Sequence, residues 1–227
     1  MTNSYIGSEL ELFAAATKWK AYFASVLAPF IGARVLEIGA GIGSNISFLH
    51  TPAVRHWTSV EPDPDLARRI TERVGLGELP ETCRVLVGTI EGIEKTARFN
   101  TVFYIDVLEH IADDAAELNC AASHLAPNGN LVVLAPAHQF LFSEFDAAIG
   151  HHRRYNAVSL TAVTPLHCRL RTCFMLDYLL YARFRWFFRI ARQPFPARRD
   201  DAVNKADRLL GQGSRTCLPS TRHSHGT

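Results

Sequence analysis

The sequence predicts an α/β fold in which a doubly wound, mostly parallel sheet carries helices on both faces. Between residues 34 and 134, short apolar runs alternate with stretches of helical periodicity, the order that builds parallel strand–helix–strand units. A glycine-rich turn at residues 39–43 joins the first apolar run to a helical stretch. The chain has 227 residues, of which 48% are hydrophobic, and this is enough apolar material for the core of one globular domain.

The glycine-rich turn follows the first predicted strand and reads E-I-G-A-G-I-G over residues 37–43. Glycine lets a backbone approach a ligand closely, and the helix that follows offers free N–H groups to an anionic group. The turn therefore predicts a Rossmann-like site for a nucleotide-type cofactor. A tight strand–helix turn that binds nothing is the alternative.

The spacing of the glycines argues against a dinucleotide. In the dinucleotide pattern G-x-G-x-x-G, the third glycine would stand at Ser44, whereas here it is Gly43, one residue earlier. Glu37 stands two residues before the first glycine, where a carboxylate is unfavourable for a pyrophosphate but suits a cationic ligand. S-adenosylmethionine, which carries an ammonium and a sulfonium group, is such a ligand.

Four further segments each contain a predicted strand. Residues 58–63 and 84–90 predict the second and third strands, 101–111 a fourth strand that runs into a loop and a short helical turn, and 125–134 a helix end, a turn and a fifth strand. Glu61 ends the second strand about twenty residues after the turn, where a Rossmann-like fold places a carboxylate on the ribose hydroxyls. Taken alone, Glu61 is more typical of a solvated loop residue, and its register with the glycine turn favours the ribose role. Because ligands bind at the carboxyl ends of parallel strands, we expect these segments to end around one pocket.

Three ordered motifs resemble those of the class I S-adenosylmethionine-dependent methyltransferases: E-x-G-x-G-x-G from residue 37, D-V-L-E-H-I from residue 106 and L-x-P-x-G-x-L from residue 125. The resemblance covers roughly residues 30–136 and implies that S-adenosyl-L-methionine is the cofactor. It also places the adenine beside Thr89 and Ile90 and the methionine part beside Asp106. The cofactor-binding residues implied in this way are Glu37, Gly39, Ala40, Gly41, Gly43, Glu61, Pro62, Thr89, Ile90, Asp106 and Val107.

A long insert follows the fifth strand and is expected to lie over the pocket mouth. Its run P-A-H-x-x-L-F-S-x-F-D-x-x-x-G-H-x-R-R-Y resembles a bacterial subgroup of these methyltransferases that is associated with glycan or lipid-linked sugar pathways. Aromatic and basic side chains suit an acceptor-binding surface, which predicts acceptor contacts from His152, Arg153, Arg154 and Tyr155. The alternative is that the two arginines pair with surface carboxylates.

Methyl transfer is an in-line displacement at a sulfonium, so the enzyme mainly aligns donor and acceptor. An acceptor hydroxyl also needs a general base, for which His110, His138 and His151 are the candidates. A nicotinamide-dependent oxidoreductase is a different reading, disfavoured by the glycine spacing and by the lack of a Tyr-x-x-x-Lys pair. A catalytically impaired, methyltransferase-like binding module is the non-enzymatic alternative.

The chain divides into four predicted parts. Residues 1–33 form an N-terminal helical cap that begins at Ser8, and residues 34–136 form the cofactor-binding core. Residues 137–210 add the insert, a sixth strand at 170–175 and a basic amphipathic helix at 178–192, which either lies on an anionic membrane or packs on its own domain. The polar segment 211–227 predicts a disordered tail that lacks the final antiparallel strand of this fold.

The net charge and the cysteine content limit which ligands, partners and cell compartment the sequence predicts. A formal net charge of +2 is too small to argue for nucleic acid by itself. The five cysteines form no C-x-x-C pair, and no His/Cys cluster has zinc-ligand spacing, so we expect no metal. With no signal peptide and no apolar run long enough to span a bilayer, we expect reduced thiols in the cytoplasm, with peripheral contact to the inner membrane through 178–192 as an alternative.

Overall fold

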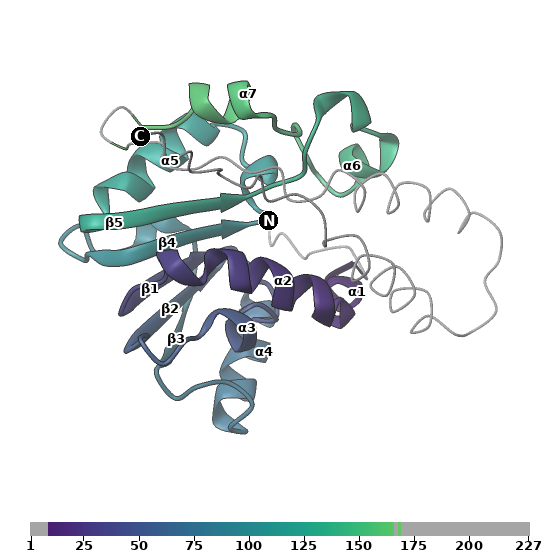
Figure 1. The fold of residues 1–227 in the computed structure, drawn as a ribbon. Coiled ribbons are helices and arrows are strands. Elements are labelled where there is room, and N and C mark those ends of the chain that lie inside the picture. Colours follow the sequence, from purple (N-terminus) through teal and green to yellow (C-terminus); the bar gives the residue numbers. More distant parts are fainter. Residues whose placement is uncertain (1–8, 166–167, 169–227) are drawn as a thin grey trace, which may run out of the picture.

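A computed structural model describes residues 9–165 and 168 of the chain. Within them, five parallel strands form one sheet with the order β3-β2-β1-β4-β5 (Figure 1). The strands are β1 (Arg34–Ile38), β2 (His56–Glu61), β3 (Cys83–Val87), β4 (Phe99–Ile105) and β5 (Leu125–Leu134). This confirms the predicted α/β, Rossmann-like fold, and it brings the carboxyl ends of all five strands to one edge of the sheet.

Helices and short 3₁₀ turns connect the strands and cover both faces of the sheet (Figure 1). The helices are α1 (Glu9–Ala15), α2 (Thr17–Leu27), α3 (Ile46–Leu49), α4 (Pro64–Gly75), α5 (Asp114–Ser123), α6 (Glu144–Ala148) and α7 (Ala157–Ala162). The 3₁₀ turns are η1 (Ala28–Phe30), η2 (Ile90–Gly92), η3 (Leu108–His110) and η4 (Gln139–Leu141).

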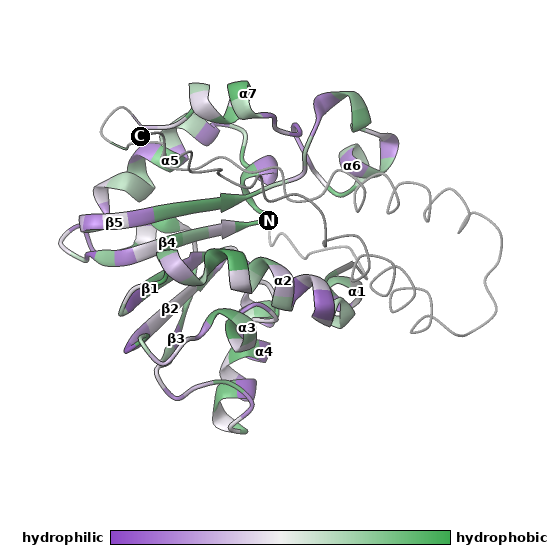
Figure 2. Ribbon diagram, viewed as in Figure 1, coloured by the Kyte–Doolittle hydropathy of each residue, from purple (hydrophilic) through white to green (hydrophobic). Residues whose placement is uncertain are grey.

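Two hydrophobic cores lie on opposite faces of the sheet because successive residues of a strand point to opposite sides. In β1, Val35 belongs to the core beneath α2, α3 and α4, whereas Leu36 belongs to the core that contains residues of α5. Both side chains are fully buried, as expected for a parallel strand covered on its two faces. Figure 2 shows that the carboxyl-terminal half of β5 is hydrophobic, whereas its amino-terminal half is more hydrophilic.

The predicted N-terminal helical cap contains two helices in its described part. The backbone turns at Ala16 (φ −77°, ψ 58°), which separates α1 from α2. The N–H of Ala16 donates to the carbonyl of Phe13, a tighter turn than that of an α-helix. This break turns α2 so that Phe23, Ala24 and Leu27 enter the core. The predicted start at Ser8 lies outside the described residues.

The predicted sixth strand at 170–175, the helix at 178–192 and the tail at 211–227 also lie outside the described residues, so each stays a prediction. In the part of the chain that the structure describes, no helix is both long and apolar enough to cross a bilayer.

Candidate active site

The glycine-rich turn between β1 and α3 has a backbone that glycine alone adopts easily. Gly39, Gly41 and Gly43 have φ values of 63°, 56° and 70°, in the left-handed region that side chains disfavour. The N–H groups of Gly39 and Ala40 donate to the carbonyl of Val60 at 2.8 and 3.2 Å, which ties the turn to the end of β2. The three glycines are therefore required by the local geometry of the turn.

Glu61 closes the turn from β2. Its Oε2 accepts a hydrogen bond from the N–H of Gly41 at 2.7 Å, and its Oε1 accepts one from the N–H of Asp63 at 3.0 Å. Asp63 in turn caps the N-terminus of α4, and Pro62 between them is exposed. Burial raises the pKa of the Glu61 carboxyl. The predicted ribose-binding carboxylate therefore lies at the glycine turn, in a fixed orientation.

Glu37, at the end of β1, is a fully buried carboxyl. It accepts hydrogen bonds from Asn45 Nδ2 at 3.3 Å and from Trp57 Nε1 at 3.2 Å. Burial raises the pKa of Glu37 to about 7 despite these bonds and the nearby charge of Lys20. Lys20 of α2 is itself buried, and its Nζ donates to Asn45 Oδ1 at 2.5 Å.

Sequence reasoning missed Lys20, Asn45 and Trp57, which surround Glu37. Lysine on a helix is usually exposed, so no local pattern indicates that Lys20 is buried. Burial lowers the pKa of the Lys20 ammonium, while the carboxylates of Asp106 and Glu37 raise it. These effects show that the cap helix α2 brings a basic group to the acidic edge of the sheet.

The remaining predicted cofactor residues follow β3 and β4. Asp106 has a φ of 53° and donates its N–H to Leu134 at 2.8 Å, so it ends β4 in a left-handed conformation. Val107 packs over the turn, because a Cβ added at Gly39 would lie 2.6 Å from its side chain. Thr89 is exposed, whereas the Ile90 side chain is buried in the core, so an adenine contact from Ile90 would use its backbone.

The insert after β5 is bound to the turn that follows β4. The N–H of His138 donates to Tyr155, and the N–H of Tyr155 donates back to Pro136, at 2.6 and 2.8 Å. The N–H of His152 donates to the carbonyl of Glu109 at 2.8 Å. The described part of the insert therefore lies at the carboxyl edge of the sheet, beside D-V-L-E-H-I.

The four predicted acceptor-binding residues differ in their burial and in the partners of their side chains. Arg154 is buried and forms a bidentate pair with Asp146, from Nε at 2.8 Å and from one terminal nitrogen at 2.9 Å. Arg153 contacts Asp114 at 2.5 Å and the carbonyl of Ala112 at 2.7 Å.

The Tyr155 hydroxyl also donates to Asp114, at 2.7 Å, while the His152 side chain is exposed. The structure thus pairs both arginines with carboxylates, which are themselves buried rather than on the surface. Acceptor contact through these four residues stays a prediction.

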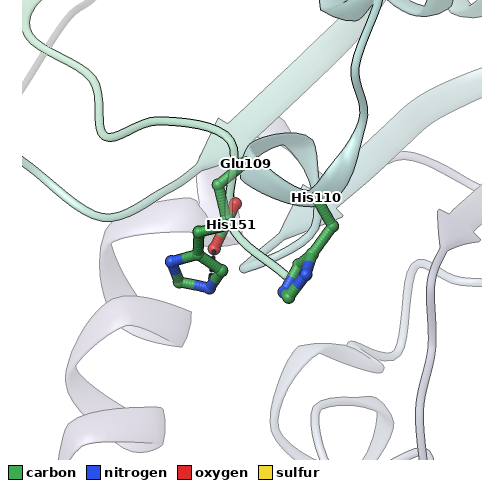
Figure 3. Close-up of side chains that lie close together, drawn as sticks. All are labelled: Glu109, His110 and His151. Atoms are coloured by element: carbon green, nitrogen blue, oxygen red, sulfur yellow. Dashed lines mark ion pairs between the residues drawn. The ribbon is translucent and has the colours of Figure 1, made fainter. Parts of the chain in front are cut away.

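Two of the three predicted general bases lie together. The ring centroids of His110 and His151 are 4.5 Å apart, and the two ring planes are nearly perpendicular. His151 Nδ1 lies 3.1 Å from Asp146 Oδ1. Its Nε2 lies 3.9 Å from Glu109 Oε1 (Figure 3). Burial, followed by the neighbouring His151 and His152, lowers the pKa of His110 to about 4. His138, the third candidate, has a φ of 66° and stacks obliquely on Phe140.

The chain is similar to known methyltransferases in sequence. The family model of a methyltransferase domain matches residues 11–172. Two curated relatives are named ubiquinone biosynthesis O-methyltransferase. The one from Methylocella silvestris is 31% identical over 129 residues, covering 54% of this chain and 46% of the relative. The one from Xylella fastidiosa is 29% identical over 152 residues, covering 59% of this chain and 61% of the relative. The chain thus matches about half to three fifths of these relatives.

Solved structures share the fold at low sequence identity. The YcgJ protein from Bacillus subtilis has a TM-score of 0.56 and 16% identity, with 65% of this chain and 66% of that chain covered. A putative methyltransferase from Haloferax volcanii, solved in complex with the Trm112 methyltransferase activator, also has a TM-score of 0.56 and 16% identity, with 69% and 71% covered.

Proposed function

This chain belongs to the methyltransferase domain family, and we propose that it transfers the methyl group of S-adenosylmethionine to a hydroxyl oxygen of a small-molecule acceptor. One observation carries the proposal: the carboxylate of Glu61 is fixed against the N–H of Gly41 at the carboxyl edge of a parallel sheet. The names of the two curated relatives support oxygen as the atom that is methylated.

The residues at this edge fit the cofactor. Each Glu61 oxygen has a further lone pair, with which the carboxylate would accept hydrogen bonds from the two ribose hydroxyls. The carboxyls of Glu37 and Asp106 add negative charge near the Lys20 ammonium, which suits a ligand with a sulfonium and an ammonium. When bound, S-adenosylmethionine supplies an electrophilic methyl group. We propose that Thr89 and the Ile90 backbone line the adenine and that Asp106 faces the methionine part.

The protein contributes alignment and deprotonation. Donor and acceptor have to stand in line at the methyl group, and the turn holds the donor side fixed. His110 is uncharged at neutral pH because its pKa is lowered to about 4, so it has a lone pair for an acceptor proton. His151 lies beside it, and His138 stays a third candidate for the same role.

The acceptor side is proposed to be the insert, which is bound to the turn after β4. It would present exposed His152 and the partly exposed Arg153 to the acceptor. A glycan or a lipid-linked sugar is the alternative acceptor class, from the resemblance of the insert to the bacterial subgroup.

A methyl-transfer assay tests the proposal. Tag-free protein is incubated with S-adenosylmethionine labelled in its methyl group and with three panels of acceptors: hydroxylated aromatic compounds, soluble glycans and lipid-linked sugars. We expect label to enter the first panel and expect Gly41→Val to abolish the transfer. Label in the second or third panel alone would overturn the acceptor class. Binding of S-adenosylmethionine with no transfer to any panel would favour a binding module instead.

A further inference from the structure

Glu109 is a buried carboxyl without a hydrogen bond. It is 0% exposed, and among the described residues neither of its side-chain oxygens has a hydrogen-bond partner. Burying a polar group in this way costs roughly 1–3 kcal/mol, and more when the group is charged. Buried carboxylates are normally paired with a cation or with donors. The charge of nearby Arg154 lowers the pKa of Glu109 and so compensates it in part, but no donor bonds to its oxygens, which leaves them open to a further group.

Two imidazoles face this carboxyl. Glu109, His110 and His151 each offer one donor atom, and these three atoms all lie within 4.8 Å of one another. Figure 3 shows the three side chains converging, with Glu109 and His110 from the turn after β4 and His151 from the insert. His151 Nε2 is the nearest, at 3.9 Å from Glu109 Oε1. Two imidazoles and a carboxylate from two separate segments thus surround one point.

A second carboxylate orients His151. Asp146 Oδ1 lies 3.1 Å from Nδ1 of His151, which places the proton on Nδ1 and leaves the lone pair of Nε2 toward Glu109. Asp146 is held in turn by Ser143 at 2.7 Å and by Arg154 at 2.8 Å. A ligating histidine in proteins typically donates its other ring N–H to a carboxylate in this way. His151 therefore has the orientation of a metal ligand.

We propose that Glu109, His110 and His151 bind a divalent transition-metal cation such as Zn²⁺, Mn²⁺ or Co²⁺. Two imidazole nitrogens and one carboxylate oxygen form a donor set that suits these ions better than it suits Mg²⁺ or Ca²⁺, which prefer oxygen. Typical metal–ligand distances are about 2.0–2.2 Å, so small side-chain rotations would close the three donors onto one ion. Three protein ligands leave further coordination positions open.

A proton on Glu109 is the competing explanation. Burial, together with the nearby charge of Asp106, raises the pKa of Glu109 well above its ordinary value, so the carboxyl is neutral if nothing else compensates it. Glutamine at this position would reproduce the neutral carboxyl in shape and polarity, but it would not replace an anionic ligand. Glu109→Gln therefore separates the two explanations.

The open positions of the cation give it a role in the reaction, and this part rests on the proposed methyl transfer. The cluster joins the turn after β4 to the insert, and Glu109 is close enough to Asp106 to be influenced by its charge. An acceptor hydroxyl bound to the cation would lose its proton more readily, because a metal ion lowers the pKa of a bound oxygen. His110 and His151 would then act as ligands rather than as bases, and the proton of the acceptor hydroxyl would pass to solvent water or to His138, the third candidate base.

Metal binding is tested without cofactor or acceptor. Tag-free protein is stripped with a chelator and titrated with Zn²⁺, Mn²⁺ and Co²⁺, and then with Mg²⁺ and Ca²⁺, by calorimetry, while visible absorption follows Co²⁺. We expect one site with a Co²⁺ spectrum. We expect Glu109→Gln and His151→Asn to remove it, and Asp146→Asn to weaken it by about 10–100-fold. His56→Ala is the matched control, because His56 is exposed at the opposite end of β2.

The outcomes are distinct. No transition-metal binding, or equal binding by wild type and by a folded Glu109→Gln protein, would overturn the metal site and leave the methyl-transfer proposal standing. Metal binding that depends on Glu109, in a protein that transfers no methyl group, would support the site and overturn the proposed function. Circular dichroism of each variant verifies folding, and the absorption spectrum of bound Co²⁺ reports nitrogen ligation independently of activity.

Discussion

The carboxylate of Glu61 accepts a hydrogen bond of 2.7 Å from the backbone N–H of Gly41, which joins the end of β2 to the turn after β1. A second backbone N–H, from Asp63, holds the other oxygen at 3.0 Å. The carboxylate is therefore oriented by the backbone alone. Because the Glu61 side chain is already held in one orientation, it loses little conformational freedom when a ligand binds to it, which favours binding.

Cofactor choice is the first prediction. We expect the protein to bind S-adenosylmethionine and S-adenosylhomocysteine and to bind NAD poorly, because the edge of the sheet carries carboxyls at Glu37, Glu61 and Asp106 that repel a pyrophosphate. Isothermal titration with the three ligands measures this directly. Tight NAD binding without heat from S-adenosylmethionine would contradict the assigned site.

Glu61→Ala is the second prediction. The variant loses charge-assisted hydrogen bonds to the ribose, worth roughly 1.5–3 kcal/mol, so affinity for S-adenosylmethionine should fall roughly tenfold to hundredfold. Because Glu61 also binds the backbone of Gly41, thermal unfolding is measured in parallel to separate loss of affinity from loss of structure. Exposed Glu81 serves as the control position, and Glu81→Ala should bind as wild type does. Equal affinities for all three proteins would remove Glu61 from the site.

The third prediction concerns pH and Glu37. Its pKa is about 7 in the folded protein against 4.5 as the reference for the unfolded chain, so the folded state holds more protons between these values. The Glu37 contribution to the free energy of unfolding is therefore present below pH 4.5 and lost as pH rises to 7, by about 3 kcal/mol in total.

Glu37→Gln removes this dependence, so its stability relative to wild type should rise as pH is raised through that window. Urea unfolding at pH 4.5, 6 and 8 measures the difference. A constant difference across the three values would show that Glu37 ionises normally.

The fourth prediction compares two neighbouring arginines. Arg154→Ala leaves the carboxylate of Asp146 buried and without its bidentate partner, which should lower the free energy of unfolding by about 3–5 kcal/mol. The Arg153 side chain is 28% exposed, so Arg153→Ala should cost about 1 kcal/mol or less. Urea unfolding gives both values. Affinity for S-adenosylmethionine, measured on folded protein, should be spared in both variants, and a collapse of that affinity would contradict the acceptor-side assignment.

The sheet and the glycine turn were predictable because their signals are local. Each signal can be recognised within a window of a few residues: the apolar runs, the glycines at 39, 41 and 43, and the acidic residue at 61. The break at Ala16 was not predictable, since neither proline nor glycine marks it. Its position depends instead on how α2 packs Phe23 and Leu27 into the core.

The polar contacts of the site were harder to predict for a different reason. The cluster of Glu109, His110 and His151 combines segments far apart in the chain, whereas metal sites are found in sequences by short spacings. The spacing rule therefore predicts no metal, and the metal titration proposed above tests that expectation. Likewise, Arg154 and Asp146 are ordinary surface residue types, and only the fold of the insert shows that they are buried together.

Backbone hydrogen bonds join the two ends of the segment 136–155 to each other, from Tyr155 to Pro136, and tie this segment to the turn after β4, from His152 to Glu109. Ordering a residue costs roughly 1–2 kcal/mol, and here the described part of the insert bears that cost when the chain folds. An acceptor that binds to the insert, as proposed, would not bear this entropic cost. Under that proposal the fixed shape of the insert selects acceptors by fit, and its residues are those to change when a different acceptor is wanted.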